Sequence, residues 1–465
     1  MPGTHKGNHH YDLLVIGSGP AGEKGAAQAA YFGKRVALVE RAAELGGAAA
    51  NTGTLPSKTL RETSLYLSGF RQRGLYGVSV HVQASVSAQD FLHRQQVVAE
   101  TERARIEANL EHHKVTRYQG FASFVDANTV EVNGQHLRAD VILIATGSHP
   151  FRPPLFPFGD PRVFDSDTIL KLGAIPKSML VAGGGVIGCE YACLFAALGL
   201  KVTLVEGRDR LLGFLDTEIG DALTASMRKM GIDVLLNESI EAVEAAASLN
   251  VKLKSSPTVA VESLLAATGR SGNTAGMNLE AIGLKPNSRG QLDVNEHYQT
   301  AVPNIYAAGD VIGFPALAST SMEQARVAMV HAFDLKYKTA IATILPLGIY
   351  TIPECSQAGE TEETLRKAGV PHVVGRARFA QNARGHIIGD QDGFLKLVFR
   401  AEDMRLAGVA VIGEQASELV HVGLAALQMG ATADLFIQMC FNYPTLSEAY
   451  KYATYEALGA KARLT

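Results

Sequence analysis

The fold of this chain is decided by the stretch Leu13-Leu14-Val15-Ile16-Gly17-Ser18-Gly19-Pro20-Ala21-Gly22, an apolar run that leads directly into a glycine motif. Residues 179–188 repeat the arrangement 166 residues later, and Gly183, Gly185 and Gly188 stand at the matching positions. The next apolar segment after each motif ends in an acid, Glu40 in the first copy and Glu206 in the second. This order of strand, glycine motif, helix and strand predicts two Rossmann-like units and an α/β fold class.

The glycine spacing has a physical reason. The first glycine makes the turn, the second lets the backbone approach a pyrophosphate, and the third lets the helix pack close to the strand. The helix N-terminus favours negative charge, and the acid accepts hydrogen bonds from a ribose. We therefore expect two dinucleotide sites, a flavin and a nicotinamide being the expected pair; the alternative is two glycine-rich turns without nucleotide. The expected contacts are Gly17, Gly19, Pro20, Ala21, Gly22 and Glu40 at the first site, and Gly183, Gly185, Val186, Ile187, Gly188 and Glu206 at the second.

Length and composition limit the classes of protein that remain. A chain of 465 residues exceeds what one hydrophobic core usually supports, and a net charge of −3 without a basic block argues against a nucleic-acid partner. Four scattered cysteines do not form a secreted disulfide framework, and no metal site is expected. The first ten residues have no apolar run, and no apolar run approaches the roughly 20 residues that cross a bilayer. We expect a cytoplasmic protein with no membrane insertion.

Composition also changes along the chain. Prolines cluster after Ala145-Thr146-Gly147, and Ala267-Thr268-Gly269 repeats that ending, which predicts a second unit inserted into the first. Alternating segments and two helical stretches after residue 345 indicate a C-terminal α+β domain. The expected domains are 1–150 and 271–344 for the first unit, 151–270 for the second, and 345–465 for the third.

With these pieces in place, the chain resembles the flavin-dependent pyridine nucleotide–disulfide oxidoreductases over essentially its full length. The resemblance implies FAD at the first motif, a nicotinamide dinucleotide at the second, and dimerisation through the C-terminal domain, with a homodimer as the minimum assembly. It implies that Asp310, in Ala308-Gly309-Asp310, hydrogen-bonds the flavin's sugar-alcohol chain. Further cofactor contacts are expected at Gly47, Thr54, Gly147 and Gly269.

The segment 46–58 departs from the disulfide reductases. They have two cysteines five residues apart where this chain has Ala49 and Thr54, and a histidine where Tyr443 precedes Pro444. Neither Ala49 nor Thr54 can form a thiolate or a disulfide, so a dithiol relay is excluded at this site. A phenol with a pKa of about 10 is a poor substitute for imidazole.

Two charged residues of the family's site are retained, and a third has a structural interpretation. The resemblance implies that Lys58 lies by flavin N5 and pairs with Glu190, where it would favour the anionic reduced flavin and so act in catalysis. The alternative for Lys58 is a surface lysine on an exposed helix. Thr445 and Glu448 have the spacing of a helix capping box, which we favour over a catalytic role for Glu448.

Within the family the chain looks most like the soluble, FAD-containing pyridine nucleotide transhydrogenases. Four separated stretches carry this resemblance: residues 53–62, 269–274, 347–354 and 441–445. The implied mechanism is a reversible ping-pong relay, in which NADPH gives hydride to FAD N5 and NAD⁺ then takes it. Such enzymes often keep the first cysteine of the pair, whereas this chain has Ala49.

Other interpretations remain open. A quinone or dye reductase would share the first half-reaction, and a non-catalytic, flavin-bearing interaction protein would keep the motifs as relics. At the second site, Glu206 favours the 2′-hydroxyl of NAD and repels a 2′-phosphate. Arg208 and Arg210 follow directly, and they either grip that phosphate or are solvated loop charges.

Overall fold

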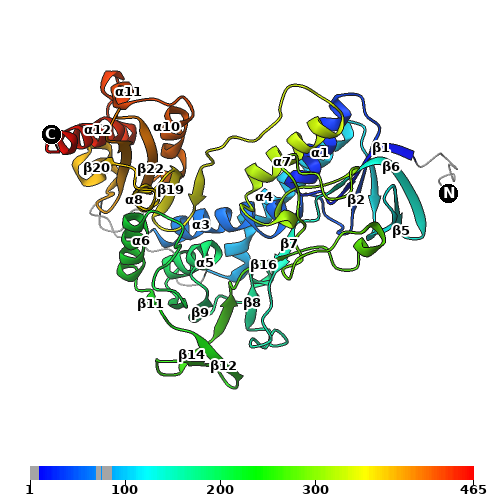
Figure 1. Ribbon diagram of the computed structural model, residues 1–465. Helices are drawn as coiled ribbons and strands as arrows, with labels where there is room; N and C mark the ends of the chain where they lie inside the picture. Colours follow the sequence, from blue (N-terminus) through cyan, green and yellow to red (C-terminus); the bar gives the residue numbers. More distant parts are fainter. Residues whose placement is uncertain (1–9, 70–74, 76–85, 465) are drawn as a thin grey trace. The chain divides into compact units, whose positions relative to one another are not determined.

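The computed structural model describes residues 10–69, 75 and 86–464, so the first nine residues, part of the segment used to argue against a leader, lie outside it. The chain forms two compact units, and Figure 1 labels many of their elements. The first comprises Met1–Thr59, Leu92–Phe151 and Gly269–Ala342, and the second comprises Leu60–Phe91, Arg152–Thr268 and Thr343–Thr465.

The first unit is built on a seven-stranded sheet with the order β3-β2-β1-β6-β5-β4, in which β17 also pairs with β6. Helices α1 and α7 pack against each other beside this sheet (Figure 1). The strands are β1 (His10–Ile16), β2 (Val36–Glu40), β3 (Thr116–Gln119), β4 (Ala122–Asp126), β5 (Thr129–Val132), β6 (Gln135–Ile144) and β17 (Ile305–Ala307), and β7 (Ser148–Pro150) pairs separately with β16 (Arg270–Gly272). The helices are α1 (Pro20–Tyr31), α2 (Gly47–Asn51), α7 (Ala318–Ala332), η3 (Leu279–Ile282), η4 (Asp310–Ile312), the start of α3 (Thr54–Ser68) and most of α4 (Ala88–His112).

The sequence of strand β1 is a continuous apolar run because both of its faces are buried. Leu13 and Val15 pack into the core on one face of the sheet, and Leu14 and Ile16 pack into the core on the other. Successive side chains of a strand point to opposite faces, so a parallel strand covered on both sides is apolar at every position. Because β1 pairs in parallel with β2 and β6, the carboxyl ends of these three strands lie at the same edge of the sheet.

The second unit contains a parallel sheet with the order β11-β10-β9-β15-β8. Its strands are β8 (Val163–Asp165), β9 (Ser178–Ala182), β10 (Lys201–Val205), β11 (Asp233–Leu235) and β15 (Ser263–Ala266), with helices η2 (Thr168–Lys171), α5 (Val186–Ala197) and α6 (Thr217–Lys229). A small antiparallel sheet of β12 (Ile240–Ala245), β13 (Leu249–Leu253) and β14 (Val259–Val261) follows. In sequence, Arg152–Thr268 lies between two parts of the first unit, which confirms the predicted insertion.

The rest of the second unit is an antiparallel sheet with the order β18-β19-β22-β21-β20, with helices packed against it. Helix α12 lies across β20, and this contact requires Gly375, where a Cβ would fall 1.8 Å from the carbonyl oxygen of Ala453. The elements are β18 (Leu347–Ile349), β19 (Glu354–Gly359), β20 (His372–Arg378), β21 (Phe394–Arg400), β22 (Leu406–Gly413), α8 (Glu362–Lys367), η5 (Phe379–Gln381), α9 (Ala383–Ile388), α10 (Ala416–Gln428), α11 (Ala433–Gln438), η6 (Leu446–Glu448) and α12 (Ala449–Ala462). The predicted α+β domain is confirmed.

The predicted capping box at Thr445 and Glu448 is wrong. The Thr445 hydroxyl donates to the carbonyl oxygen of Asn442 at 2.7 Å, and no side-chain hydrogen bond caps the short η6 turn. Glu448 is itself the residue before α12 and has helical dihedral angles. A 3₁₀ turn replaces the first helical turn that the spacing predicted.

Candidate cofactor and nucleotide sites

The first glycine motif joins β1 to α1. Gly17 has a φ of +105°, and a Cβ there would lie 2.4 Å from the carbonyl oxygen of Ala145, so only glycine fits. A Cβ on Gly22 would lie 1.9 Å from the oxygen of Gly17, which shows how closely the helix packs on the turn. A Cβ on Gly19 would meet only the Cα of Gly47, at 3.9 Å. The face of Gly19 is therefore open, as the approach of a pyrophosphate requires.

Glu40 is fixed at the end of β2 beside this motif. Its Oε2 accepts hydrogen bonds from the backbone N–H and the hydroxyl of Ser18, at 2.9 and 2.7 Å, and its Oε1 accepts one from the N–H of Ala42. The Ser18 hydroxyl also accepts a hydrogen bond from the N–H of Gly46. Ser18 therefore ties the acid to the segment 46–47, a role that the sequence analysis did not assign.

Besides the glycine motif and Glu40, candidate cofactor contacts follow β6 and β17. The buried hydroxyl of Thr146 has no hydrogen-bond partner among the described residues, which is unusual for a buried polar atom and fits a ligand that would satisfy it. Asp310 accepts a hydrogen bond from the Ser148 hydroxyl at 2.7 Å, and Arg270 donates to both oxygens of Ser148 at 2.8 Å. Gly147 has a φ of +68° and no atom within 4 Å of an added Cβ.

The residues of the first unit fit an FAD. They combine an open glycine turn, a fixed acid at the strand end, an unsatisfied buried hydroxyl and the oriented carboxylate of Asp310. Pro20 and Ala21 form the start of α1, whose N-terminus faces the same turn.

The segment that would carry the dithiol forms α2 and the start of α3. Ala49 lies on α2, and Thr54 is the exposed first residue of α3. Lys58 follows one turn later on the same helix face, half-buried, with its Nζ 3.3 Å from the Ser57 hydroxyl. Glu190 belongs to the second unit, on α5, where its buried carboxylate accepts a hydrogen bond from the N–H of Tyr350 at 3.0 Å. The pairing of Lys58 with Glu190 stays a prediction.

The second glycine motif reproduces the geometry of the first. Gly183 has a φ of +110°, and a Cβ there would lie 2.5 Å from the carbonyl oxygen of Ala267. A Cβ on Gly188 would lie 1.8 Å from the oxygen of Gly183, while one on Gly185 would meet nothing within 4 Å. Val186 and Ile187 are the first residues of α5. Gly269, predicted as a further contact, lies in the first unit, where its carbonyl oxygen accepts from the N–H of Phe151.

Glu206 differs from Glu40 in what covers its carboxylate. The backbone contacts match, because Oε2 accepts from the N–H of Gly184 and Oε1 from the N–H of Arg208. In addition, the Arg208 guanidinium donates to both oxygens, from Nε at 2.9 Å and Nη2 at 3.0 Å. Burial alone would raise the pKa of Glu206, but Arg208 and the Gly184 amide outweigh burial and lower the pKa below its ordinary value. The negative charge at this strand end is therefore paired.

Three of the four cysteines are buried in the second unit as free thiols. On α5, Cys189 points to the carbonyl oxygen of Gly184, at 3.5 Å, and Cys193 to that of Ile352, at 3.8 Å. Cys355 accepts a hydrogen bond from the Thr351 hydroxyl. Burial raises the pKa of all three, to about 12 for Cys193. These contacts are those of small buried groups that pack the interior of the unit.

We expect these three thiols to be inert in the native protein. The raised pKa leaves Cys193 with far less thiolate at pH 8 than an ordinary cysteine, and burial blocks access as well. Titration with a disulfide reagent should show fast reaction of Cys440 at most, and reaction of the others only after unfolding. Fast native reaction of two or more thiols would contradict this account.

Comparisons with known proteins agree with this geometry. Residues 11–332 match the family described as pyridine nucleotide-disulphide oxidoreductase, and residues 345–454 match its dimerisation domain. The chain belongs to this family. It is 45% identical over 455 residues to a soluble pyridine nucleotide transhydrogenase of Mycobacterium bovis, covering 96% of this chain and 97% of that protein. It is 42% identical over 458 residues to one of Yersinia enterocolitica, with 97% and 98% covered. The predicted resemblance to the transhydrogenases is thereby confirmed.

Solved structures of other family members share the fold. The HOCl-induced flavoprotein disulfide reductase RclA from Escherichia coli superposes with a TM-score of 0.87 at 27% identity, over 96% of this chain and 99% of that one. LpdA from Mycobacterium tuberculosis gives the same TM-score and identity over 97% and 99%. Among the described residues, no helix is long and apolar enough to span a bilayer. The expected self-association is supported by the dimerisation domain.

Proposed function

We propose that this protein transfers hydride from NADPH to NAD⁺ in a reversible ping-pong reaction, using FAD and no dithiol. The observation that carries the proposal is the combination of two glycine turns, 17–22 and 183–188, with a segment, 46–58, that has no thiol. The relatives at 42–45% identity, named soluble pyridine nucleotide transhydrogenases, support it. Bound FAD would supply a two-electron carrier at N5.

The chain's own residues position the reactants and set their electrostatics. We propose that the turn 17–22 holds the FAD pyrophosphate, Glu40 the adenosine ribose and Asp310 the sugar-alcohol chain, with Gly47, Thr54 and Gly147 lining the site. Lys58 would place a positive charge beside the isoalloxazine ring and pair with Glu190. The second turn, 183–188, would hold either nicotinamide nucleotide in turn, with Gly269 lining the approach. Little acid–base chemistry is needed, because hydride moves between carbon and nitrogen.

We further propose how the second site accepts both nucleotides. A guanidinium has five N–H donors, and Arg208 uses two of them on Glu206. The remaining donors are available to a 2′-phosphate, while Glu206 is available to the 2′-hydroxyl of NAD(H) when Arg208 turns away. The half-exposed position of Arg208 allows both arrangements.

Replacing Arg208 by glutamine tests this nucleotide selection. We expect the Kd for NADPH to rise about 10- to 100-fold, because a charge-assisted phosphate contact is lost. The Kd for NADH should change by about 3-fold or less. Equal weakening of both nucleotides would show that Arg208 only supports the fold of the site.

The absence of a relay is tested by two further variants. Thr54→Ala and Tyr443→Phe remove the hydroxyls that stand where a thiol relay would have its second cysteine and its base. We expect each variant to keep both half-reactions within about 3-fold, because neither hydroxyl exchanges a proton in the proposed reaction. Anaerobic stopped-flow absorbance would follow NADPH oxidation and NAD⁺ reduction separately. A loss above about 100-fold in either variant would contradict the thiol-free mechanism.

We also propose the domain boundaries 1–150, 151–270, 271–344 and 345–465, a homodimer as the minimum assembly, and a cytoplasmic location. Analytical ultracentrifugation and cell fractionation test the last two.

A further inference from the structure

The loop 207–216 connects the second nucleotide site to helix α6. Near its start, the Arg208 carbonyl oxygen accepts a hydrogen bond from the N–H of Asn237, and the side chain is paired with Glu206. In its middle, Leu212 is buried and donates its N–H to the carbonyl oxygen of Gly184 at 3.2 Å. Leu212 has a φ of +46°, a strained conformation for leucine that persists only where the surroundings hold it.

The end of this loop is held by the C-terminal sheet. Gln357, buried on β19, accepts a hydrogen bond from the N–H of Asp216 at 2.9 Å and donates one to the carbonyl oxygen of Phe214 at 3.1 Å. The N–H of Thr217 lies 3.3 Å from a carboxylate oxygen of Glu363. The side-chain amide of Gln357 therefore fixes two backbone groups of the loop, the N–H of Asp216 and the carbonyl oxygen of Phe214.

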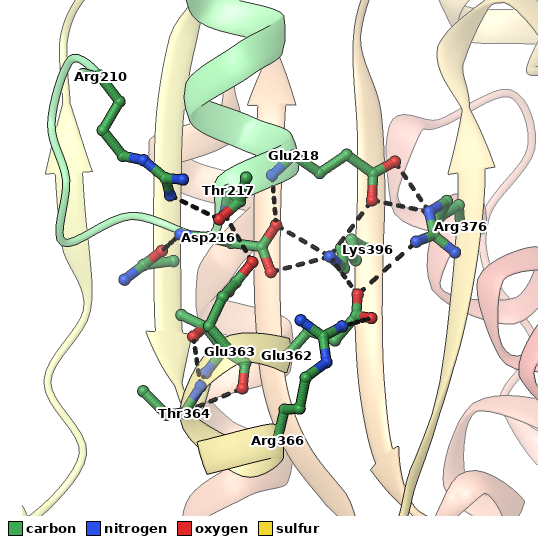
Figure 2. A network of polar contacts seen from close by, with 12 residues as sticks. Arg210, Asp216, Thr217, Glu218, Glu362, Glu363, Thr364, Arg366, Arg376 and Lys396 are labelled. Atoms are coloured by element: carbon green, nitrogen blue, oxygen red, sulfur yellow. Dashed lines mark hydrogen bonds and ion pairs between the residues drawn. The ribbon is translucent and has the colours of Figure 1, made fainter.

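A buried lysine completes this attachment, as Figure 2 shows. Lys396, on β21 and 1% exposed, places its Nζ 2.9 Å from each carboxylate oxygen of Asp216, which is equally buried. Its other partners are Glu362 at 3.0 Å and Glu218 at 3.3 Å. Burial alone would lower the pKa of Lys396, but the hydrogen bonds and charges of Asp216 and Glu362 raise it overall, so the lysine stays charged.

Asp216 links the lysine to the helix and to the loop. Its Oδ1 accepts a hydrogen bond from the N–H of Glu218, which caps the N-terminus of α6. The next residue, Thr217, accepts a hydrogen bond at its hydroxyl from Nη1 of Arg210 at 2.7 Å (Figure 2). The second arginine of the loop, Arg210, is thus oriented by Thr217, whose backbone N–H is held by Glu363 of α8. Arg208 has its own anchors.

We propose that Lys396 and Gln357 are positioning residues for nucleotide selection: by fixing the end of the loop 207–216 they hold Arg210 where it strengthens binding of a 2′-phosphate. The inference rests on the proposed role of this loop in accepting NADP(H). Nucleotides with a free 2′-hydroxyl depend on Glu206 and the glycine turn. The hydrogen bond from the Gly184 N–H to Glu206 does not involve the end of the loop. A loop that is already ordered costs less conformational entropy when it binds, so loosening it weakens phosphate binding selectively.

The test measures binding of two adenosine fragments by calorimetry, 2′,5′-ADP and 5′-AMP, on the purified full chain. In Lys396→Met and in Gln357→Met we expect the Kd for 2′,5′-ADP to rise about 5- to 20-fold, and the Kd for 5′-AMP to change less than about 2-fold. Equal weakening of both fragments, or no change of 2′,5′-ADP, would overturn the inference. If removal of the buried lysine prevents folding, the Gln357 variant decides alone, because it removes two hydrogen bonds and no charge.

A matched control and a double variant sharpen this test. Lys229 pairs with Asp392 at 2.6 Å and so joins the far end of α6 to the segment just before β21. Lys229→Gln should leave both Kd values within about 2-fold. In an Arg210→Gln background, Lys396→Met should have no further effect on 2′,5′-ADP, since the two act in series. An undiminished further effect would show that the lysine does not act through Arg210.

The inference and the proposed function fail in different ways. If Arg208→Gln and Arg210→Gln both bind 2′,5′-ADP as tightly as the unmodified protein, the loop does not select the nucleotide. The proposed selection by Arg208 and the positioning role of Lys396 and Gln357 then both fall, whereas hydride transfer is tested separately. If either arginine variant is weakened while the Lys396 and Gln357 variants are not, the loop keeps its role and only the positioning role is wrong.

Discussion

The variant Gly185→Ala is expected to lose nicotinamide-nucleotide binding while keeping its FAD. A Cβ at Gly185 meets no atom of the described residues within 4 Å and the residue has a φ of −78°, so alanine fits this part of the chain without strain. The same Cβ would stand where a pyrophosphate must approach the turn. We expect the Kd for NADH and NADPH to rise about 30-fold or more, equivalent to about 2 kcal/mol. Calorimetry and the flavin absorbance of the purified protein measure the two effects.

The first motif supplies the matched variant. Gly19 has a φ of −65°, and its Cβ would only touch the Cα of Gly47 at 3.9 Å, so Gly19→Ala should fold as well. Here we expect the protein to be purified largely without flavin, and its binding of 5′-AMP at the second site to be retained. Loss of flavin in the Gly185 variant and retention in the Gly19 variant would reverse the assignment of the two sites. Gly22→Ala and Gly188→Ala are unsuitable, because their Cβ atoms would collide with the turn itself.

The second large effect is expected at Lys58. Its ammonium group is half-buried on α3, one helical turn after the position where the disulfide reductases have their second cysteine. Lys58→Met removes a charge that would stabilise the electron-rich flavin, so hydride transfer from NADPH should slow by about 10- to 100-fold. The Kd for NADPH should stay within about 3-fold, because the nucleotide is held at the second motif.

Two further measurements identify this effect as electrostatic. The flavin midpoint potential should fall in Lys58→Met, and Lys58→Arg should restore much of the rate because it restores the charge. An unchanged potential and rate in Lys58→Met would place the side chain away from the flavin and leave it as a half-buried helix lysine without a catalytic role.

Much of the fold was predictable from local patterns. The two glycine motifs predicted two Rossmann-like units because each glycine is required by the shape of the short turn in which it lies. The duplicated spacing has a duplicated geometry, since Gly17 and Gly183 have φ values of +105° and +110° and their acids accept hydrogen bonds from matching amides. The repeated Ala-Thr-Gly sequence at 145–147 and 267–269 likewise predicted that the second unit is inserted into the first.

Other features depend on residues that are distant in sequence. Nothing near Thr146 in sequence indicates that its hydroxyl has no hydrogen-bond partner among the described residues. The hydrogen bonds from Arg270 through Ser148 to Asp310 join three separate segments. Lys396 reads as an ordinary polar residue in an alternating strand, and its burial depends on acids brought in from α6 and α8. The predicted capping box is absent for a local reason: the Thr445 hydroxyl donates to the carbonyl oxygen of Asn442 and accepts no capping hydrogen bond from the η6 turn.

The most direct test of the central claim is an anaerobic assay with NADPH and the thionicotinamide analogue of NAD⁺, followed at the absorbance of the reduced analogue. Lipoamide, oxidised glutathione and a quinone are run in parallel as alternative acceptors. We predict rapid reduction of the analogue, saturable in both nucleotides with parallel double-reciprocal lines, and no turnover of either disulfide. Failure to reduce the analogue, with rapid turnover of the quinone, would contradict hydride transfer between nucleotides and identify a quinone reductase. Turnover of lipoamide would contradict the interpretation of Ala49 and Thr54.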